Sequence, residues 1–214
     1  MTVSVSRGNE FDTGLLGHRC WLELANGDRI ELAVERWTEG CREGDELLLA
    51  PCGGPTLDIG CGPGRLAAAL TERGVVSLGI DSSTTAVRLS RQRGAIALRR
   101  DVFERLPGES RWQHALLADG NIGIGGDPVK LLRRVRELIA SDGSALVELE
   151  PPGSGLRYEQ VQVRSHLHDD SPGSWFTWAW VGVDAIADIA EQAALRVKWT
   201  AHRGHRWFAE LVHS

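Results

Sequence analysis

Three glycines and one carboxylate in the first half of the chain form the pattern with the clearest chemical meaning. The segment LDIGCGPGR, residues 57–65, places Gly60, Gly62 and Gly64 between a short apolar stretch and a helical pattern. The backbone N–H groups of such a turn hold negatively charged ligand groups, and the missing side chains let a nucleotide-like ligand lie against the backbone. Asp81 follows about twenty residues after Gly60, where a carboxylate accepts hydrogen bonds from both ribose hydroxyls.

The spacing within this segment distinguishes two kinds of nucleotide cofactor. A dinucleotide fingerprint has its third glycine five positions after the first, and that position is Arg65 here. Asp58 stands two positions before Gly60, where a pyrophosphate has no use for a negative charge. A carboxylate there suits the ammonium group of an amino-acid ligand. The pattern therefore favours a ligand with an amino-acid portion over a dinucleotide.

Alternating strands and helices are expected to position these residues. Residues 65–73, 83–93 and 129–140 have helical patterns, with Ser82 or Ser83 as a cap and Pro128 opening the third helix. Short apolar strands are expected at 56–59, 75–80, 95–99, 112–117 and 144–150. This alternation predicts a parallel sheet with right-handed crossovers, which is a doubly wound α/β fold.

The two ends of the chain have antiparallel patterns. Asn26-Gly27 lies between alternating segments and predicts a β-hairpin over 18–37, which we expect to be an appendage of the main domain. We therefore divide the chain into a hairpin extension (1–50) and a main domain (51–214). Further strands are expected at 158–165 and 175–181, so that 157–181 is a hairpin suited to a substrate lid, followed by a helix over 184–194 and a hairpin over 195–212.

Composition excludes several classes of protein. The chain has 214 residues and a net charge of −5, which fits one domain and gives no basic footprint for nucleic acid. No stretch approaches 18 apolar residues, and the first residues contain no apolar signal segment, so we expect no membrane span and a cytoplasmic location. The four cysteines include no CxxC pair, so we expect free thiols and no metal site. The oligomeric state stays open.

The segments DIGCGPG and VVSLGID resemble motif I and its acidic partner in class I S-adenosylmethionine-dependent methyltransferases. The resemblance covers residues 55–150, and the closing hairpin at 195–212 extends it. It implies a doubly wound, mostly parallel seven-stranded Rossmann-like sheet with an antiparallel C-terminal hairpin strand. It also implies S-adenosyl-L-methionine as cofactor, S-adenosyl-L-homocysteine as product, and in-line methyl transfer to an oxygen, nitrogen or carbon atom of a small-molecule acceptor.

The same resemblance implies roles for residues around the glycine-rich turn. Asp58 and the loop Gly60–Gly64 would hold the methionine portion of the cofactor, and Cys61 would lie in that loop because a small side chain fits there. Asp81 would bind the ribose hydroxyls, and Ser82 would line the adenosine.

Further roles follow for residues after the third and fourth strands. Asp101 would lie near the adenine amino group, and Val102 would pack on the ring. Asp119 and Gly120 would lie beside the sulfonium and its methyl group. The family commonly continues into an apolar helix after this point, whereas residues 120–126 are too rich in glycine to be helical. This segment favours a close backbone approach to cofactor or substrate, with a flexible connector as the alternative.

Candidate acceptor-side residues are fewer and less specific. His166 and His168 follow the expected strand 158–165 and precede two aspartates, so they are candidates for a general base, with a polar loop or a metal site as alternatives. Asn121, Trp175 and Trp178 are candidate substrate residues, although the tryptophans fit core packing equally well.

Two rival functions remain open from the sequence. The first is an NAD(P)-binding oxidoreductase, which Arg65 and the missing Tyr-x-x-x-Lys pair disfavour. The second is a protein that binds S-adenosylmethionine without transferring a methyl group, because a fold does not determine a reaction. The Asn/Asp-Pro-Pro-Tyr motif typical of nucleic-acid base methylation is absent from the sequence, and Glu150-Pro151-Pro152 is no substitute because it follows the fifth strand.

Overall fold

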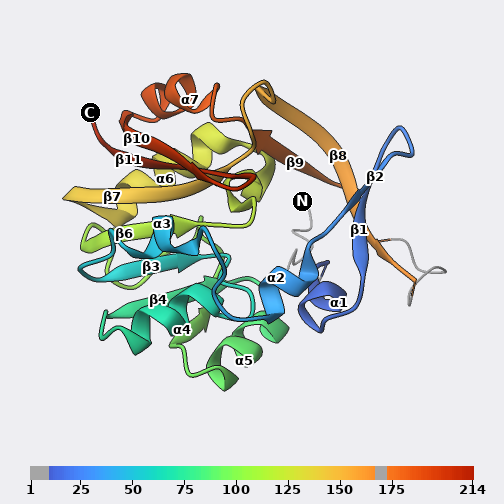
Figure 1. Cartoon of the computed structure of the whole chain (residues 1–214), viewed down its shortest axis with the longest axis horizontal. Helices are drawn as coiled ribbons and strands as arrows, with labels where there is room; N and C mark the ends of the chain where they lie inside the picture. The colour runs from blue at the N-terminus through green and yellow to red at the C-terminus, as the bar shows by residue number, and fades with distance from the viewer. Residues whose placement is uncertain (1–9, 167–172) are drawn as a thin grey trace.

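The computed structural model of the chain describes residues 10–166 and 173–214, and Figure 1 shows their arrangement. Two sheets are present among these residues, which we call the main sheet and the second sheet. No helix in the described ranges is long and apolar enough to cross a membrane. The main sheet has the strands β3 (Thr56–Ile59), β4 (Ser77–Asp81), β5 (Ala97–Arg99), β6 (Trp112–Leu117), β7 (Ile139–Leu149), β10 (Leu195–Arg203) and β11 (Arg206–His213).

The main sheet has the order β10-β11-β7-β6-β3-β4-β5. The five strands from β7 to β5 are parallel to one another, and β11 is antiparallel to both β7 and β10. Parallel strands buried on both faces are expected to be almost continuously apolar, and all four residues of β3 are buried. The prediction of a seven-stranded, mostly parallel sheet with an antiparallel C-terminal hairpin is confirmed.

Helices cover both faces of the main sheet and begin at residues suited to that position. Ser83 accepts a hydrogen bond from Ala86 N (3.0 Å), and Asp127 accepts one from Lys130 N (3.0 Å). These are the side-chain caps expected at helix N-termini. The helices around the sheet are α3 (Asp45–Leu49), α4 (Arg65–Glu72), α5 (Thr84–Gln92), α6 (Pro128–Leu138) and α7 (Ile186–Gln192).

The second sheet joins segments from the two ends of the chain. Its order is β2-β1-β8-β9, and every pair is antiparallel. The hairpin predicted around Asn26-Gly27 is present, but it pairs with the hairpin after β7 and is not an isolated appendage. The second sheet therefore draws strands from both sides of the domain boundary predicted at residue 50, and it lies beside the main sheet in Figure 1. Its strands are β1 (Cys20–Leu24), β2 (Arg29–Glu31), β8 (Leu156–Ser165) and β9 (Phe176–Val181).

The second strand of the N-terminal hairpin is shorter than predicted. β2 ends at Glu31, and the helix α2 (Val34–Thr38) follows it. The short helix α1 (Asp12–Leu15) precedes β1. The alternation of residue types continues to Trp37 but does not specify a strand there. Helical geometry instead brings Arg36 to two carboxylates on the main sheet, and such tertiary contacts override local propensity.

Residues 121–126 correct a second expectation. Asn121–Gly126 form a short 3₁₀ helix, η1, with a kink at Ile124 and Gly125, although the glycine content predicted no helix. Gly123 packs against β9, and a Cβ there would lie 2.6 Å from Trp178 Cε2. The close backbone approach expected at this segment is therefore made to a strand of the second sheet.

Two element boundaries also differ from prediction. The third predicted helix ends at Leu138, and the backbone enters β7 directly at Ile139. α7 begins at Ile186, and Asp184 accepts a hydrogen bond from Gly155 N (3.3 Å) where we expected it to cap the helix. In both places the local pattern identifies the element but not its first or last residues.

Replacement of Gly123 by alanine tests how η1 supports the second sheet. The added methyl group overlaps Trp178, so Gly123→Ala is expected to lower the free energy of unfolding by about 1–3 kcal/mol. Gly53→Ala is a matched control, because a Cβ at Gly53 meets no atom within 4 Å. Urea unfolding of both variants measures the difference, and equal stabilities would contradict the described packing.

Candidate functional site

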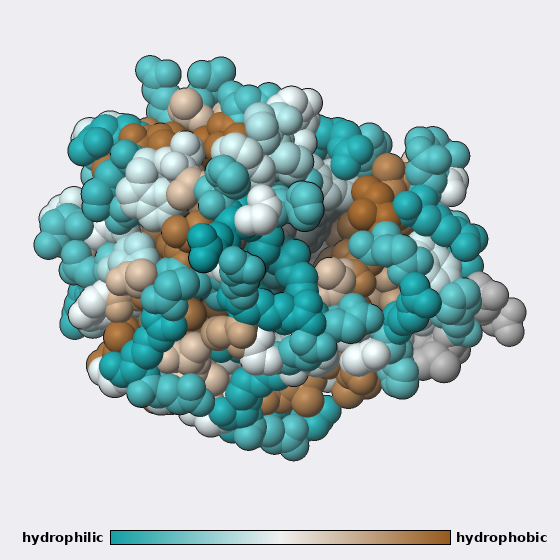
Figure 2. Space-filling model, in the orientation of Figure 1, coloured by the Kyte–Doolittle hydropathy of each residue, from teal (hydrophilic) through white to brown (hydrophobic). Residues whose placement is uncertain are grey.

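A cavity of about 1340 Å³ opens where the carboxyl ends of the parallel strands face the second sheet. In Figure 2 the surface is hollowed between the main body and the second sheet, and hydrophobic side chains gather on the second-sheet side. Ligands in open α/β sheets bind beyond the carboxyl ends of the strands. Thirteen of the sixteen site residues predicted from the sequence line this cavity: Asp58, Gly60, Cys61, Gly62, Asp81, Ser82, Asp101, Val102, Asp119, Gly120, Asn121, Trp175 and Trp178.

The glycine-rich turn connects β3 to α4 and is held by the end of β4. Gly62 N donates a hydrogen bond to Asp81 Oδ2 (3.0 Å). Gly64 has a left-handed φ of +80°, and a Cβ there would lie 2.9 Å from Ser90 Cα in α5. Gly64 does not line the cavity, so it permits close packing between α4 and α5. Gly60 and Gly62 form the cavity wall.

Asp58 is buried at the base of the cavity and makes no salt bridge with a described residue. Burial raises its pKa to about 7, Arg65 opposes the rise and Asp119 adds to it. Arg65 directs its guanidinium group to two other carboxylates. A buried carboxylate that has no salt-bridge partner among the described residues is stabilised by a cationic ligand group.

Asp81 ends β4 with its carboxylate already oriented by the backbone. In addition to Gly62 N, Ser83 N donates to Asp81 Oδ1 (2.8 Å). Burial raises the pKa of Asp81, and these two hydrogen bonds oppose the rise. α1 supports the same region, because Asp12 accepts hydrogen bonds from Ser83 Oγ (2.5 Å) and Thr85 Oγ1 (2.7 Å).

The residues after β5 and β6 close the other side of the cavity. Asp101 accepts a hydrogen bond from Phe103 N (2.9 Å), and Val102 is almost fully buried. Asn121 Nδ2 donates to the carbonyl oxygens of Ile59 and Gly60, at 2.9 Å each. The amide of Asn121 therefore holds the glycine-rich turn, a role that the sequence did not indicate.

The two histidines predicted as general bases do not line the cavity among the described residues. His166 is exposed and lies against Trp21, with ring centroids 5.0 Å apart. His168 lies outside the described residues. The described residues contain no group of three or more His, Cys, Asp and Glu side chains arranged to hold a metal ion.

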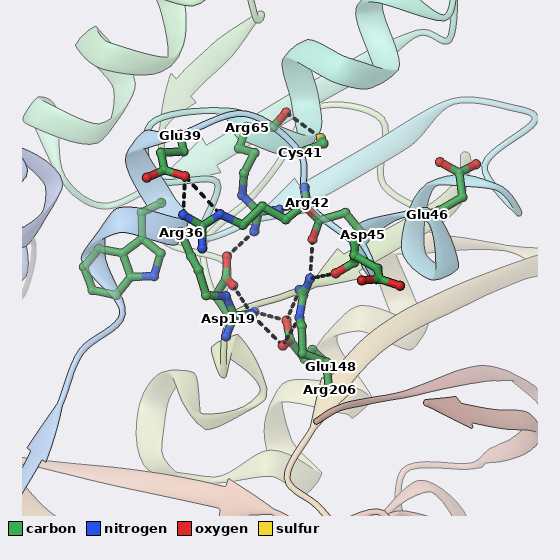
Figure 3. Close-up of polar contacts among 12 residues, drawn as sticks. Arg36, Glu39, Cys41, Arg42, Asp45, Glu46, Arg65, Asp119, Glu148 and Arg206 are labelled. Carbon is green, nitrogen blue, oxygen red and sulfur yellow. Dashed lines mark hydrogen bonds and ion pairs between the residues drawn. The ribbon is translucent and has the colours of Figure 1, made fainter. Parts of the chain in front are cut away.

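Six alternating charges form a closed network at the edge of the cavity, which we call the charge ring. Figure 3 shows its members converging from α2, α3, α4, the turn after β6, β7 and β11. Each member has two oppositely charged neighbours, so the ring carries three positive and three negative charges. Its members in order are Arg36, Asp119, Arg65, Asp45, Arg206 and Glu148.

The geometry of the charge ring is mostly that of charge-assisted hydrogen bonds. Arg206 contacts both oxygens of Glu148 at 2.8 Å, a bidentate arrangement, and its Nη1 lies 2.8 Å from Asp45 Oδ1. Arg36 Nη2 lies 2.8 Å from Glu148 Oε1 and 2.9 Å from Asp119 Oδ1. Burial raises the pKa of Glu148, but its arginine partners outweigh that effect and the pKa lies below its usual value.

Asp119 shows what the charge ring does for the site. Its φ of +52° is in the left-handed region, which costs energy for a residue with a side chain. Arg36 and Arg65 hold its carboxylate, at 2.9 and 2.6 Å, and Asp119 N donates to Glu148 Oε2 at 2.8 Å. The ring thus fixes the turn after β6, which lines the cavity.

Sequence reasoning missed several residues that complete the site. The ring members Arg36, Asp45, Glu148 and Arg206 are distant in sequence, and no motif links them. The missed residues that line the cavity include two arginines, two glutamates and two aromatic residues: Arg36, Arg65, Glu148, Glu150, Phe11 and Trp37. Among these residues the sequence offers a signal only for Glu150, which is a carboxylate at the end of a predicted strand.

Comparison with known proteins agrees with this fold. A family model described as a methyltransferase domain matches residues 56–143. A tabtoxin biosynthesis enzyme from Pseudomonas amygdali pv. tabaci is 28% identical over 144 residues, which are 65% of this chain and 54% of that enzyme. The chain therefore spans about half the length of this curated relative.

Solved structures share the fold at low sequence identity. A methyltransferase from Bacteroides fragilis, dependent on S-adenosylmethionine and in complex with S-adenosyl-L-homocysteine, has a TM-score of 0.78 and 19% identity over 98% of this chain and 97% of that chain. The 1,6-didemethyltoxoflavin-N1-methyltransferase of Burkholderia thailandensis has a TM-score of 0.58 and 17% identity over 75% and 71%. Residues 56–143 thus match a methyltransferase-domain model, the fold is that of the solved methyltransferases, and the resemblance to class I methyltransferases is confirmed.

Loss of one charge in the ring is expected to be costly. Asp45 is 1% exposed, and Asp45→Asn removes one of the two counter-charges of both Arg65 and Arg206 and leaves the ring with a net positive charge, so unfolding should become easier by about 3–5 kcal/mol at pH 7. Burial raises the pKa of Asp45, but Arg65, the Arg42 N–H and Arg206 lower it below its usual 3.8. The stabilisation is therefore present above about pH 4 and is lost as pH falls further.

Glu46→Gln provides the control for this prediction. Glu46 is the next residue, and its pair with Arg73 is solvent-exposed, so its loss should cost less than about 1 kcal/mol. Urea unfolding at pH 7 and pH 3 compares the two variants with the unchanged protein. A cost for Asp45→Asn no larger than that for Glu46→Gln would show that the ring does not stabilise the fold.

Proposed function

We propose that this chain is an S-adenosylmethionine-dependent methyltransferase that acts on a small-molecule acceptor. The proposal rests on one observation: Asp58, the glycine-rich turn and Asp81 all line the same cavity. S-adenosyl-L-homocysteine bound to the Bacteroides fragilis protein supports the choice of cofactor. The bound 1,6-didemethyltoxoflavin of the Burkholderia thailandensis enzyme supports a small-molecule acceptor.

The described residues fit this cofactor in charge and in shape. Asp58 is a buried carboxylate without a salt bridge, which suits the ammonium group of the methionine portion. The lone pairs of Asp81 that the backbone does not use suit the ribose hydroxyls. We assign Ser82, Asp101 and Val102 to the adenosine side of the same cavity.

The remaining part of the cavity receives the acceptor in this proposal. S-adenosylmethionine supplies a methyl group bound to a positively charged sulfur. The chain contributes mainly by holding the acceptor atom in line with the bond that breaks and by excluding water. Asp119 and Gly120, fixed by the charge ring, are assigned to the point where the two ligands meet.

Ligand binding tests the proposal directly. The protein should bind S-adenosyl-L-homocysteine with a micromolar or lower dissociation constant, measured by titration calorimetry, and should not bind NAD or NADP. Binding of NAD alone would favour an oxidoreductase. Binding of S-adenosyl-L-homocysteine without methyl transfer to any acceptor in a broad small-molecule panel would favour a protein that uses the cofactor only as a ligand.

Asp58→Asn is expected to change stability and cofactor binding in opposite directions. The affinity for S-adenosyl-L-homocysteine should fall by about 1.5–3 kcal/mol, because a charged hydrogen-bond partner is lost. The free protein should become more stable by about 1–3 kcal/mol at pH 8, because a buried charge is removed. The exposed Asp142→Asn is the control and should change neither quantity.

The pH dependence gives the sign of the stability effect. The folded-state pKa of Asp58, about 7, exceeds its ordinary 3.8, so the folded protein takes up the proton more readily. The unchanged protein therefore loses stability relative to Asp58→Asn as pH rises from about 4 to about 7. Thermal unfolding at pH 5 and pH 8 measures this difference, and a variant that is less stable at pH 8 would contradict the assignment.

A further inference from the structure

Four aromatic rings form one wall of the acceptor side of the cavity. Phe11 lies 6.2 Å from Trp37, 6.0 Å from Phe176 and 5.8 Å from Trp178 between ring centroids, mostly edge to face. All four residues line the cavity and are only half-buried. We call Phe11, Trp37, Phe176 and Trp178 the aromatic wall. Such a wall binds planar apolar groups and, through the ring faces, cations.

Glu150 lines the same cavity from the end of β7. Its N–H donates to Val181 O (2.9 Å), and its carbonyl oxygen accepts from Val183 N (3.0 Å), so its backbone is fixed to the end of β9. β9 is the strand that carries Phe176 and Trp178 of the aromatic wall. The carboxylate of Glu150 makes no hydrogen bond or ion pair with any residue that the structure describes. Burial raises the pKa of Glu150, and Arg157 opposes the rise.

Glu148 provides an internal comparison with Glu150. Glu148 is on β7, Glu150 directly follows the last residue of that strand, and both line the cavity. Arg36, Arg206 and Asp119 N occupy the oxygens of Glu148. The charge ring contains equal numbers of positive and negative members, so it supplies no net positive charge to Glu150, and Arg157 is the cation that acts most strongly on this carboxylate. The cavity therefore combines aromatic rings with a carboxylate, Glu150, that lies outside the charge ring.

We propose that the acceptor is an arylalkylamine, with its ring against the aromatic wall and its nitrogen beside Glu150, which acts as the general base. This inference rests on the proposed methyltransferase function. An ammonium ion has no free electron pair, so the nitrogen must first lose a proton, and the Glu150 carboxylate accepts it. The nitrogen then forms a bond to the methyl carbon as the carbon–sulfur bond breaks, and the electron pair of that bond leaves on the sulfur.

Four probes that share a phenyl ring test the inference by titration calorimetry with S-adenosyl-L-homocysteine present. They are phenethylamine, phenethyltrimethylammonium, 2-phenylethanol and 3-phenylpropionate. We expect the two cations to bind at least tenfold more tightly than the alcohol, and the anion to bind most weakly. Equal affinity for amine and alcohol, preference for the anion, or no binding of any probe at millimolar concentration would overturn the proposal.

Variants separate the two parts of the proposed site. Glu150→Gln should weaken phenethylamine at least tenfold and change 2-phenylethanol less than twofold, whereas Phe176→Leu should weaken both probes equally. Glu31→Gln is the matched control, because Glu31 is an exposed carboxylate at the rim of the same cavity and should leave both affinities unchanged. An equal loss of amine binding in Glu31→Gln and Glu150→Gln would overturn the assignment of Glu150.

Binding of S-adenosyl-L-homocysteine to each variant completes the experiment. Retained cofactor binding together with failure of the amine preference would overturn the acceptor class and leave the proposed function standing. Failure of the unchanged protein to bind S-adenosyl-L-homocysteine would overturn the proposed function itself.

Discussion

The charge ring is the interaction on which the rest of the structure depends. Six charges from six separate elements neutralise one another at the junction of the main sheet, the N-terminal helices and the cavity. Removing charges from water is costly, and only complete pairing with good geometry offsets that cost. The arrangement therefore acts as a single unit: α2, α3, β7 and β11 are positioned together, and Asp119 is held in a backbone conformation that it would otherwise avoid.

This pairing has a direct effect on the electrostatics of Asp58. Arg65 stands immediately after the glycine-rich turn and is the cation nearest in sequence to Asp58, yet the ring engages it with Asp45 and Asp119. Asp58 is consequently buried without a salt bridge to any described residue, and its pKa rises to about 7. The buried charge of Asp58 thus lowers the stability of the free protein and favours the binding of a cationic group. Such a trade-off between stability and function is common.

Local patterns predicted the main sheet well because strand–helix alternation and glycine-rich turns are properties of neighbouring residues. The sequence also predicted the segment around Asp58 and the end of β4 at Asp81, because these too are patterns of neighbouring residues. The charge ring was not predictable, because Arg36 and Glu148 are far apart in the chain and have ordinary sequence surroundings. The close packing of Gly123 on β9 likewise depends on which hairpins meet, and periodicity carries no information about that.

The second sheet can form completely only late in the synthesis of the chain. β1 pairs on one side with its hairpin partner β2, but its other neighbour, β8, is translated much later, after most of the main sheet. Until then a strand edge with buried-type residues such as Leu22 and Leu24 lacks its partner, and open edges of this kind invite pairing with other chains. The long interval between β1 and β8 thus makes closure of the cavity a late, non-local event, and it exposes the nascent chain to misassembly for most of its translation.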